Sequence, residues 1–215
     1  MMDQDLKRIS NTYNDVSEEY SSAFENEHDG KPKDCEVLNR FASLLTQESK
    51  VLDLGCGPGQ TCKYLHELGV SISGLDLSEK MVEQARIYHS EITFAVGNML
   101  ALDIVDNSID GILSFYSIVH FSSNQVKKAF NEISRVLKKG GYFLCAFHIG
   151  NEIIPIMEFL GKTVDVDFML FDVPVIQNCL TEAGFEVEET EEREPYPDIE
   201  YQSKRAYILS KKLAN

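Results

Sequence analysis

The sequence has no run of about 18 apolar residues, the length that a helix needs to cross a bilayer. Its first ten residues, MMDQDLKRIS, are polar and lack the apolar segment of a secretory signal. No repeat, low-complexity tract or flexible linker divides the 215 residues, of which 43% are hydrophobic. These absences exclude membrane-spanning and disordered classes and favour one domain with a sizeable core.

The cysteines form no C-x-x-C pair and are odd in number, which excludes a regular disulfide framework and a zinc motif. Five are present, at Cys35, Cys56, Cys62, Cys145 and Cys179. The histidines show no metal-ligand spacing either. We therefore expect free thiols, a reducing cytoplasmic location and no metal site.

Basic residues are scarce: 20 lysines and arginines stand against 35 acidic residues, giving a formal charge of −15. They do not gather into a basic cluster. A surface this acidic repels phosphate backbones and anionic lipid headgroups. We therefore expect neither nucleic acid nor a membrane surface as a partner.

What the sequence does contain is a regular alternation of strand and helix patterns. Strand-like apolar runs occur at 50–55, 70–76, 92–97, 110–118 and 141–149. Helical spacing of apolar residues occurs at 34–45, 60–69, 78–88 and 125–139, with Ser78 as an N-cap. Such alternation predicts a doubly wound α/β fold with a mostly parallel sheet.

The last third of the sequence has a different pattern. Residues 151–161 and 173–184 read as helices, although Pro155 limits the first. Residues 185–192 and 205–212 read as two strands. Their connection is too short for a crossover helix, so we expect them to be antiparallel.

The run VLDLGCGPGQT, from Val51 to Thr61, ends its strand in Gly55, Gly57 and Gly59. Bare backbone at the first strand-to-helix turn lets a ligand approach main-chain N–H groups. Asp76 ends the next strand, where a carboxylate can accept from both ribose hydroxyls. Together they indicate a nucleoside site; the alternative is a tight turn in which Asp76 only caps the following helix.

The glycine spacing departs from the dinucleotide fingerprint G-x-G-x-x-G/A, because Gln60 stands where that fingerprint needs Gly or Ala. Asp53, inside the buried strand, would repel a pyrophosphate but suits a ligand with positive charge. S-adenosylmethionine carries a ribose, a purine, an amino group and a sulfonium. It fits better than NAD, which leaves an NAD-dependent oxidoreductase as a disfavoured alternative.

The sequence resembles the class I S-adenosylmethionine-dependent methyltransferases, in the small-molecule branch of methyltransferase types 11 and 25. VLDLGCGPGQT and SGLDLSEKMVEQAR are similar to the family's first and second motifs, and AVGNMLAL, DGILSFYSIVHF and EISRVLKKGGYFLCAFH to later ones. The resemblance covers residues 37–150 and extends to Lys211. It implies a Rossmann-like seven-stranded sheet with an antiparallel last strand.

The same resemblance implies two parts of the single domain. Residues 1–33, with the stretch YNDVSEEYSSAF, would form a helical lid over the cofactor, to which Tyr20 and Tyr13 are candidate contributors. Residues 34–215 would form the methyltransferase domain.

The resemblance implies cofactor contacts at the positions of this sequence that match the family's motifs. Gly55 and Gly57 would border the methionine part, Asp53 would hold its amino group and Asp76 the ribose. The remaining contacts implied are Leu77 and Met81 at the adenine face, Asn98 and Met99 at the adenine edge, and Ser114 near the methionine amino group. The family usually has an acid where this sequence has Asn98, whose carbonyl oxygen can still accept from the adenine amino group.

Methyl transfer needs chiefly positioning, and a general base only where the acceptor must lose a proton. His120, after the fourth strand, is the candidate base, with His148 second; either could instead only hydrogen-bond the backbone. The other three histidines are expected to be solvated. Tyr116, Phe121, Phe168 and Phe171 are candidates for an acceptor cavity. We expect methylation of a small molecule, the alternative being a non-catalytic cofactor-binding protein.

Overall fold

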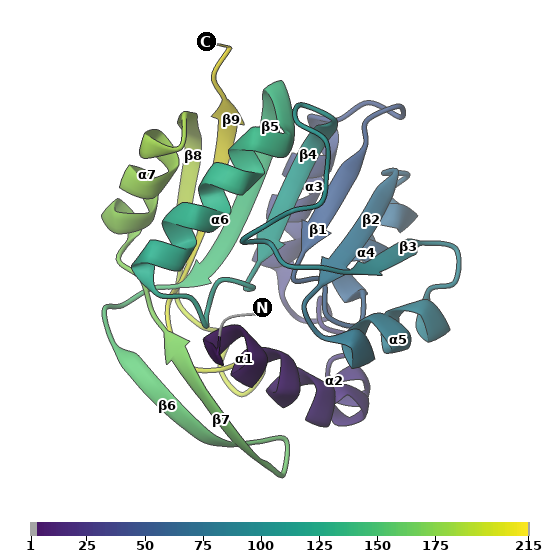
Figure 1. Cartoon of the computed structure of the whole chain (residues 1–215), viewed down its shortest axis with the longest axis vertical. Helices are drawn as coiled ribbons and strands as arrows, with labels where there is room; N and C mark the ends of the chain where they lie inside the picture. The colour runs from purple at the N-terminus through teal and green to yellow at the C-terminus, as the bar shows by residue number, and fades with distance from the viewer. Residues whose placement is uncertain (1–3, 215) are drawn as a thin grey trace.

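A seven-stranded sheet forms the centre of the computed structural model, which describes residues 4–214. Its strand order is β3-β2-β1-β4-β5-β9-β8 (Figure 1). The strands are β1 (Val51–Leu54), β2 (Ile72–Asp76), β3 (Thr93–Val96), β4 (Ile109–Phe115), β5 (Leu137–His148), β8 (Phe185–Arg193) and β9 (Arg205–Lys212). Only β9 pairs antiparallel with its neighbours, β5 and β8. The predicted fold class is confirmed.

Helices cover both faces of the sheet (Figure 1). One hydrophobic cluster contains residues of α6 (Ser123–Val136) and α7 (Val173–Glu182), and the other contains residues of α3 (Pro32–Ser43), α4 (Gln60–Glu67) and α5 (Glu79–Tyr88). All four residues of β1 are buried, as expected of a strand covered on both sides. Ser78 caps α5 as predicted, its Oγ accepting from the Met81 amide at 3.1 Å.

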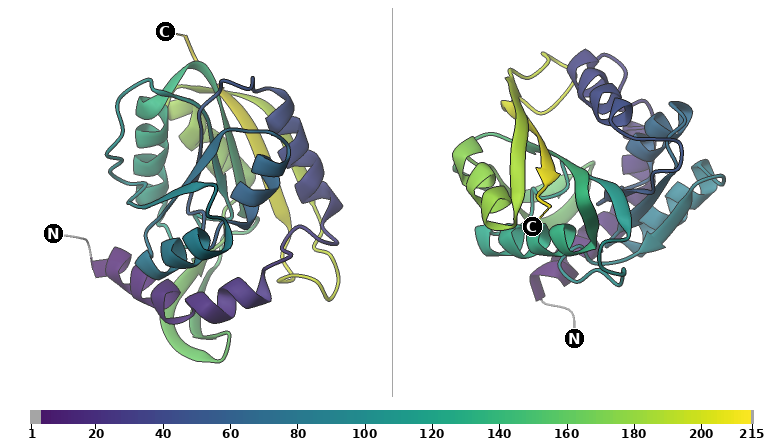
Figure 2. Two further views of the ribbon diagram at one scale, coloured as in Figure 1. Left: turned by 90° about the vertical axis from the view of Figure 1, so that its right-hand side faces the viewer. Right: turned by 90° about the horizontal axis from the view of Figure 1, so that it is seen from above.

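The first two helices, α1 (Gln4–Asp15) and α2 (Ser17–Ala23), both pack against α5, and α1 also packs against strand β7 (Lys162–Met169) (Figure 2). Asn14 fixes this position, because its Oδ1 accepts from the Ser78 hydroxyl at 2.7 Å and from the Lys80 amide at 3.1 Å. Both helices fall within the stretch 1–33 expected to form a lid, of which residues 1–3 lie outside the described part of the chain. The division into lid and domain stays a prediction.

The predicted helix at 151–161 is wrong, because this stretch is a strand. β6 (Ile153–Phe159) pairs antiparallel with β7 (Lys162–Met169) in a separate two-stranded ribbon. Pro155 would cost a helix interior about 3 kcal/mol, and the neighbouring isoleucines favour a strand. Leu160 and Gly161 both have positive φ, at 50° and 77°, which matches the backbone twist of a two-residue hairpin.

The predicted helix 125–139 also ends early, at Val136, and β5 begins at once with Leu137. Leu137 pairs with Ile109 of β4, so the backbone groups that would have extended the helix enter the sheet instead. The predicted helix 173–184 and the antiparallel pair at 185–192 and 205–212 are confirmed.

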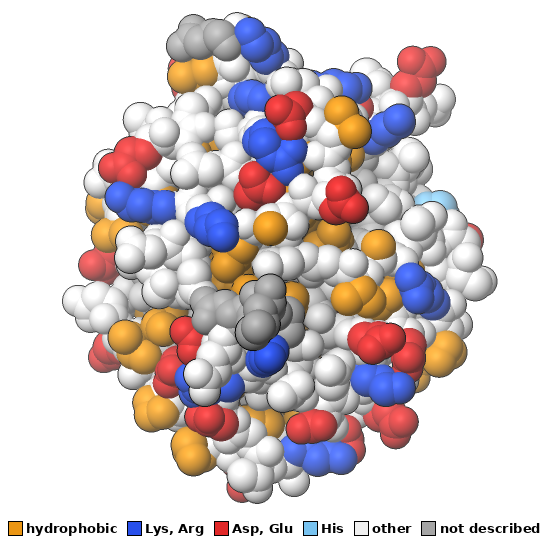
Figure 3. Space-filling view, in the orientation of Figure 1, with side chains coloured by type: hydrophobic (Ala, Val, Ile, Leu, Met, Phe, Trp, Pro, Cys, Tyr) orange, Lys and Arg blue, Asp and Glu red, His pale blue; other side chains and the backbone are white. Residues whose placement is uncertain are grey.

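Lysines and arginines lie singly among acidic side chains on the face shown in Figure 3. Across residues 4–214, no helix is both long enough and apolar enough to pass through a bilayer.

Candidate functional site

A cavity of about 160 Å³ opens where β1, β2 and β4 end, beneath α1 and α2. This is the carboxyl edge of the parallel strands, at which ligands bind in open α/β sheets. Nine of the ten predicted cofactor residues line it: Tyr20, Asp53, Gly55, Gly57, Asp76, Leu77, Met81, Asn98 and Met99. The structure therefore brings these residues together around one space.

The glycine turn needs its glycines for both conformation and space. Gly55 has φ +74°, and a Cβ placed on it would lie 2.3 Å from the Cβ of Ser117. Gly59, with φ +93°, is the residue that precedes α4. Left-handed backbone of this kind is readily adopted only by glycine. The turn thus presents bare main chain to the cavity at the start of a helix, where unpaired N–H groups collect.

Asp76 connects the two turns that border the cavity. Its Oδ2 accepts from the Gly57 amide at 2.9 Å, and its Oδ1 accepts from the Ser78 amide at 2.8 Å. Burial raises the pKa of its carboxyl, while these two amides act against that rise. An ionised carboxylate has about four acceptor sites, so two stay available for a ligand. The predicted contact with ribose remains a prediction.

Asp53 is a carboxylate in the floor of the cavity, 2% exposed. Its Oδ2 accepts only a weak bond, from the Cys62 thiol at 3.4 Å. No ion pair of residues 4–214 includes it, and burial raises its pKa to about 7. A buried carboxylate is normally paired, so the site as built favours a ligand that supplies positive charge.

Gln60 also lines this cavity, and its role was missed in the sequence. Its Nε2 is buried and has no hydrogen-bond partner within the described chain. A buried amide donor left unpaired costs about 1–3 kcal/mol, which a polar ligand could recover. The signal for this role is its place directly after the third glycine, at the start of α4, where a side chain can face the ligand.

Ser114 is the one predicted residue that the structure does not place at the cavity. It is fully buried within β4, and its hydroxyl bonds to the hydroxyl of Ser117 at 2.7 Å. Ser117, three residues later, lines the cavity and donates to the Leu54 carbonyl at 2.6 Å. Because β4 is enclosed by the core, the hydroxyl that reaches the cavity is that of Ser117, in the loop after the strand.

Asn98 uses its side-chain carbonyl locally, accepting from the Leu100 amide at 2.9 Å. Such a bond to the backbone two residues later is typical of asparagine in turns. The expected bond from the adenine amino group would therefore need the second lone pair of the same oxygen. That contact remains a prediction.

A second cavity, of about 380 Å³, adjoins the first. It lies between α1 and α2, the β6–β7 hairpin and the connection from β8 to β9, which meet at one end of the molecule (Figure 2). Of the four aromatic residues suggested for an acceptor cavity, Tyr116 and Phe168 line it. Phe121 lines the first cavity instead, and Phe171 is packed in the core.

The two cavities share part of their walls. The residues that line both are Tyr13, Tyr20, Glu27, Tyr116, Val119 and His120. A molecule in one cavity would therefore lie directly against a molecule in the other, with His120, Tyr13 and Tyr20 at the boundary.

His120 is held from both sides at this boundary. Its Nδ1 lies 2.7 Å from the Asp167 carbonyl, which can only accept, so Nδ1 carries the proton. Its Nε2, 2.8 Å from the Tyr13 hydroxyl, is then the acceptor. Burial lowers the pKa of His120 and raises that of Tyr13. A neutral imidazole with a lone pair at the shared wall is a possible proton acceptor.

The other histidines differ from one another. His148 lines the second cavity, with its Nδ1 2.6 Å from the Ser203 hydroxyl, and burial lowers its pKa to about 3. His66 is exposed as predicted. His28 is not solvated: burial lowers its pKa to about 4, and neither ring nitrogen has a partner in residues 4–214. Its ring packs on Tyr64, which the sequence did not indicate.

Part of the chain is similar in sequence to known methyltransferases. Residues 51–141 match the family described as "Methyltransferase domain". The "Uncharacterized methyltransferase YcgJ" of Bacillus subtilis is 35% identical over 119 residues, which cover 53% of this chain and 46% of that protein. An "O-methyltransferase" of Pyrenophora dematioidea is 30% identical over 167 residues, covering 71% and 59%. The chain spans about half the length of these curated relatives.

The fold similarity extends over the whole chain. The magnesium protoporphyrin IX methyltransferase of Synechocystis PCC 6803, solved with bound SAM, superposes with a TM-score of 0.75 over 99% of this chain and 98% of that one, at 15% identity. Residues 51–141 thus resemble the methyltransferase domain of these proteins, and the chain as a whole has the fold of S-adenosylmethionine-dependent methyltransferases.

Proposed function

We propose that this protein binds S-adenosylmethionine in the first cavity and transfers its methyl group to a small molecule held in the second. The observation that carries the proposal is the common wall of the two cavities, since methyl transfer needs donor and acceptor in direct contact. The family match and the curated relatives named as methyltransferases support it.

The cofactor would supply an electrophilic methyl group on its sulfonium. Asp53 would bind its amino group, which provides the positive charge that this buried carboxylate lacks. Asp76 would accept from the ribose hydroxyls. Gln60 would donate from its unpaired Nε2, and the apolar side chains of Leu77 and Met81 would enclose the adenine.

His120 would act as the base through Tyr13. The Tyr13 oxygen can accept the proton of an acceptor hydroxyl while Tyr13 gives its own proton to Nε2 of His120. The imidazolium that results keeps its Nδ1–H bond to the Asp167 carbonyl. One proton thus moves from the acceptor by way of Tyr13 to the histidine as the acceptor oxygen gains the methyl group.

S-adenosylhomocysteine is expected to raise the melting temperature of the wild-type protein by about 5–10 °C at 100-fold excess over Kd, since a native-state ligand stabilises by about 2.7 kcal/mol there. Asp76→Ala should lose most of this shift because it removes the ribose acceptor. Thermal scans with and without the ligand measure the difference, so any loss of stability in the variant itself cancels.

Asp103→Ala, an exposed acid outside both cavities, is the matched control and should keep the full shift. NAD should produce no shift in any variant. Stabilisation by NAD and not by S-adenosylhomocysteine would overturn the proposal. Transfer of label from methyl-labelled cofactor into an extract of small metabolites then distinguishes the enzyme from a non-catalytic binding protein.

His120→Ala is expected to lower kcat by about 10²–10⁴-fold, the usual contribution of a positioned base. Because burial lowers the pKa of His120, wild-type kcat should stay level to below pH 6.5 before falling with acid. Tyr13→Phe should reduce kcat similarly by breaking the relay. The measurement is the pH profile of label transfer to whichever metabolite is first found to accept it.

Tyr142→Phe is the control for Tyr13, since it also removes one tyrosine hydroxyl but lies on β5, outside both cavities. It should keep near-normal kcat. Unchanged rates in both His120→Ala and Tyr13→Phe across pH would remove the relay from the mechanism.

A further inference from the structure

The second cavity has two chemically distinct ends. One is aromatic, with the ring of Phe168 at its centre: the Phe168 centroid lies 4.8 Å from that of His148, 5.4 Å from that of Tyr201 and 6.4 Å from that of His120. These pairs are edge-to-face, the arrangement that aromatic rings prefer. Phe24 and Tyr20 add a further pair at 4.4 Å. An aromatic guest can extend this set of contacts.

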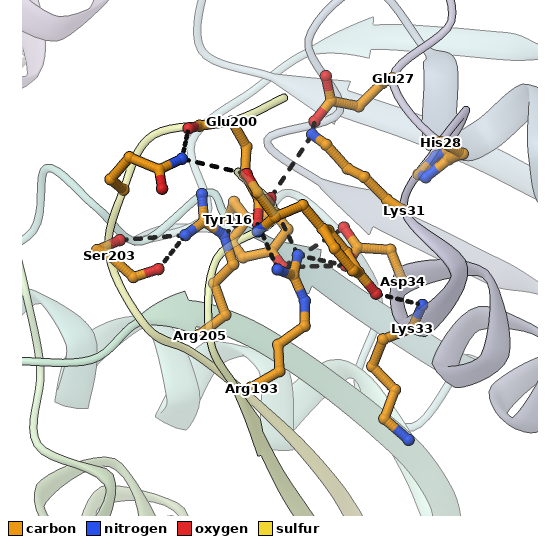
Figure 4. A network of polar contacts seen from close by, with 12 residues as sticks. Glu27, His28, Lys31, Lys33, Asp34, Tyr116, Arg193, Glu200, Ser203 and Arg205 are labelled. Atoms are coloured by element: carbon orange, nitrogen blue, oxygen red, sulfur yellow. Dashed lines mark hydrogen bonds and ion pairs between the residues drawn. The ribbon is translucent and has the colours of Figure 1, made fainter. Parts of the chain in front are cut away.

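The other end is ionic and almost completely buried (Figure 4). Glu200 is central to it, with its Oε2 3.2 Å from Nε of Arg205 and 4.0 Å from Nζ of Lys31. Lys31 also pairs with Glu27. The side chains of Glu200, Arg205 and Lys31 are 3%, 4% and 7% exposed. Charges at this depth are strongly coupled and weakly screened.

Behind these residues, a second layer completes the network (Figure 4). Arg193 donates to Oδ1 of Asp34 at 2.8 Å and from Nη2 to Glu200 at 3.0 Å. The network as a whole therefore contains three carboxylates, of Glu27, Asp34 and Glu200, and three cations, of Lys31, Arg193 and Arg205. Its formal charges cancel, and each charge already has a partner in the protein.

From this arrangement we infer that the methyl acceptor is an uncharged hydroxy-aromatic compound. Its ring would lie against Phe168, its hydroxyl would reach Tyr13 and His120, and an uncharged polar group would face Lys31, Glu200 and Arg205. This inference rests on the proposed function and names the substrate class of the same site.

The charge balance decides against charged acceptors. A carboxylate beside Lys31 and Arg205 would compete with Glu27 and Glu200, which occupy those cations, and would leave one negative charge unpaired in a buried place. Glu158, also in the cavity wall, adds to the repulsion. An ammonium group would meet the carboxylates of the network, which are all paired already, and Glu158, whose exposure to solvent screens its charge. An uncharged group that both donates and accepts can bond to this end without disturbing any pair.

Fluorescence titration with 7-hydroxycoumarin tests the inference, in the presence of saturating S-adenosylhomocysteine and at mildly acidic pH, where the phenol stays protonated. The charged comparisons are 7-hydroxycoumarin-3-carboxylic acid and a 4-aminomethyl derivative. The uncharged probe should bind at least about tenfold more tightly than either, because a buried unpaired charge is costly. Equal or tighter binding of a charged probe, or no binding of the uncharged one, would overturn the inference.

Two variants test whether the preference for the uncharged probe comes from the ionic end or from the aromatic end of the second cavity. Glu200→Gln leaves an excess of positive charge and should shift the preference toward the carboxylic acid by about tenfold or more. Phe168→Leu keeps an apolar side chain without the ring, so it should weaken the uncharged probe by about threefold to tenfold. Because Glu200 is part of a buried network and its variant could misfold, Phe168→Leu provides an independent test. Unchanged affinity in Phe168→Leu contradicts the aromatic site.

The two proposals fail in different ways. If S-adenosylhomocysteine gives no thermal shift, the proposed function fails and this test has no basis. If the thermal shift and label transfer are observed but the uncharged probe shows no preference, only the substrate class is wrong.

Discussion

Replacing Asp53 with asparagine is expected to stabilise the free protein and, at the same time, abolish most cofactor binding. Burial raises the pKa of Asp53 to about 7 from an ordinary 3.8. At about pH 8 the folded protein must therefore hold a carboxylate ionised in an apolar floor, at a cost near 4 kcal/mol. Asparagine removes that charge with little change of volume. Its melting temperature at this pH should be about 8–16 °C higher.

The raised pKa of Asp53 also determines how the stability of the free protein changes with pH. Between about pH 4 and pH 7 the folded state keeps a proton on Asp53 that the unfolded state has lost, so the stability of the wild-type free protein falls as pH rises through this range. Asp53→Asn should remove that part of the slope. Denaturant unfolding at a series of pH values measures it, with the exposed Asp103→Asn as a control that keeps the wild-type slope.

Cofactor binding should change in the opposite direction. Since a cationic ligand needs the ionised carboxylate, wild-type affinity for S-adenosylmethionine should increase from acid pH up to about pH 7, and Asp53→Asn should weaken it about a hundredfold and flatten this dependence. Calorimetric titration measures both. A variant that is more stable yet binds as tightly as wild type would show that Asp53 is not the partner of the ligand's positive charge.

Gly55→Ala is the second change with a large expected effect. Alanine would hold an unfavourable φ of +74°, which costs about 1–2 kcal/mol, and its Cβ would lie 2.3 Å from the Cβ of Ser117. That overlap forces backbone movement in a buried turn, which adds about 1–3 kcal/mol. We expect a clear loss of stability and no thermal shift with S-adenosylhomocysteine.

Gly69→Ala is the control that separates the cost of a positive φ from the cost of the steric contact with Ser117. Gly69 has a similar φ of +86° but no atom within 4 Å of the added Cβ, so this variant should lose only about 1–2 kcal/mol and retain ligand binding. In the double variant Gly55→Ala with Ser117→Gly, removal of the opposing Cβ should restore part of the stability. Equal losses in Gly55→Ala and Gly69→Ala would mean that the contact with Ser117 is unimportant.

Most of the fold could be predicted from the sequence because its elements are locally determined. The alternation of apolar runs with helical spacing fixes a parallel sheet, and Ser78 marks a helix start by side-chain chemistry alone. The β6–β7 hairpin could not be predicted as readily: Pro155 and the isoleucines around it disfavour a helix, but nothing local to 151–161 identifies the strand with which it pairs. That partner strand and the turn at Leu160 complete the hairpin.

The first cavity was predictable for the same reason: its residues follow strand ends that a parallel sheet brings to one edge. The second cavity was predictable only in part, through Tyr116 and Phe168. Phe168, Glu200 and Lys31 come from a hairpin, a connection and the start of a helix, and only tertiary packing brings them together. Likewise, Ser114 and Ser117 have the same side chain and lie three residues apart. The point at which β4 ends determines which of them reaches the cavity.

The bond between Tyr13 and His120 joins α1 to the loop after β4. Any opening of this helix that admits or releases cofactor by this route also separates the tyrosine from the imidazole. Methyl transfer and cofactor exchange would then require different positions of α1. The protein could catalyse the reaction only while α1 is closed, and the rate at which α1 opens would limit turnover.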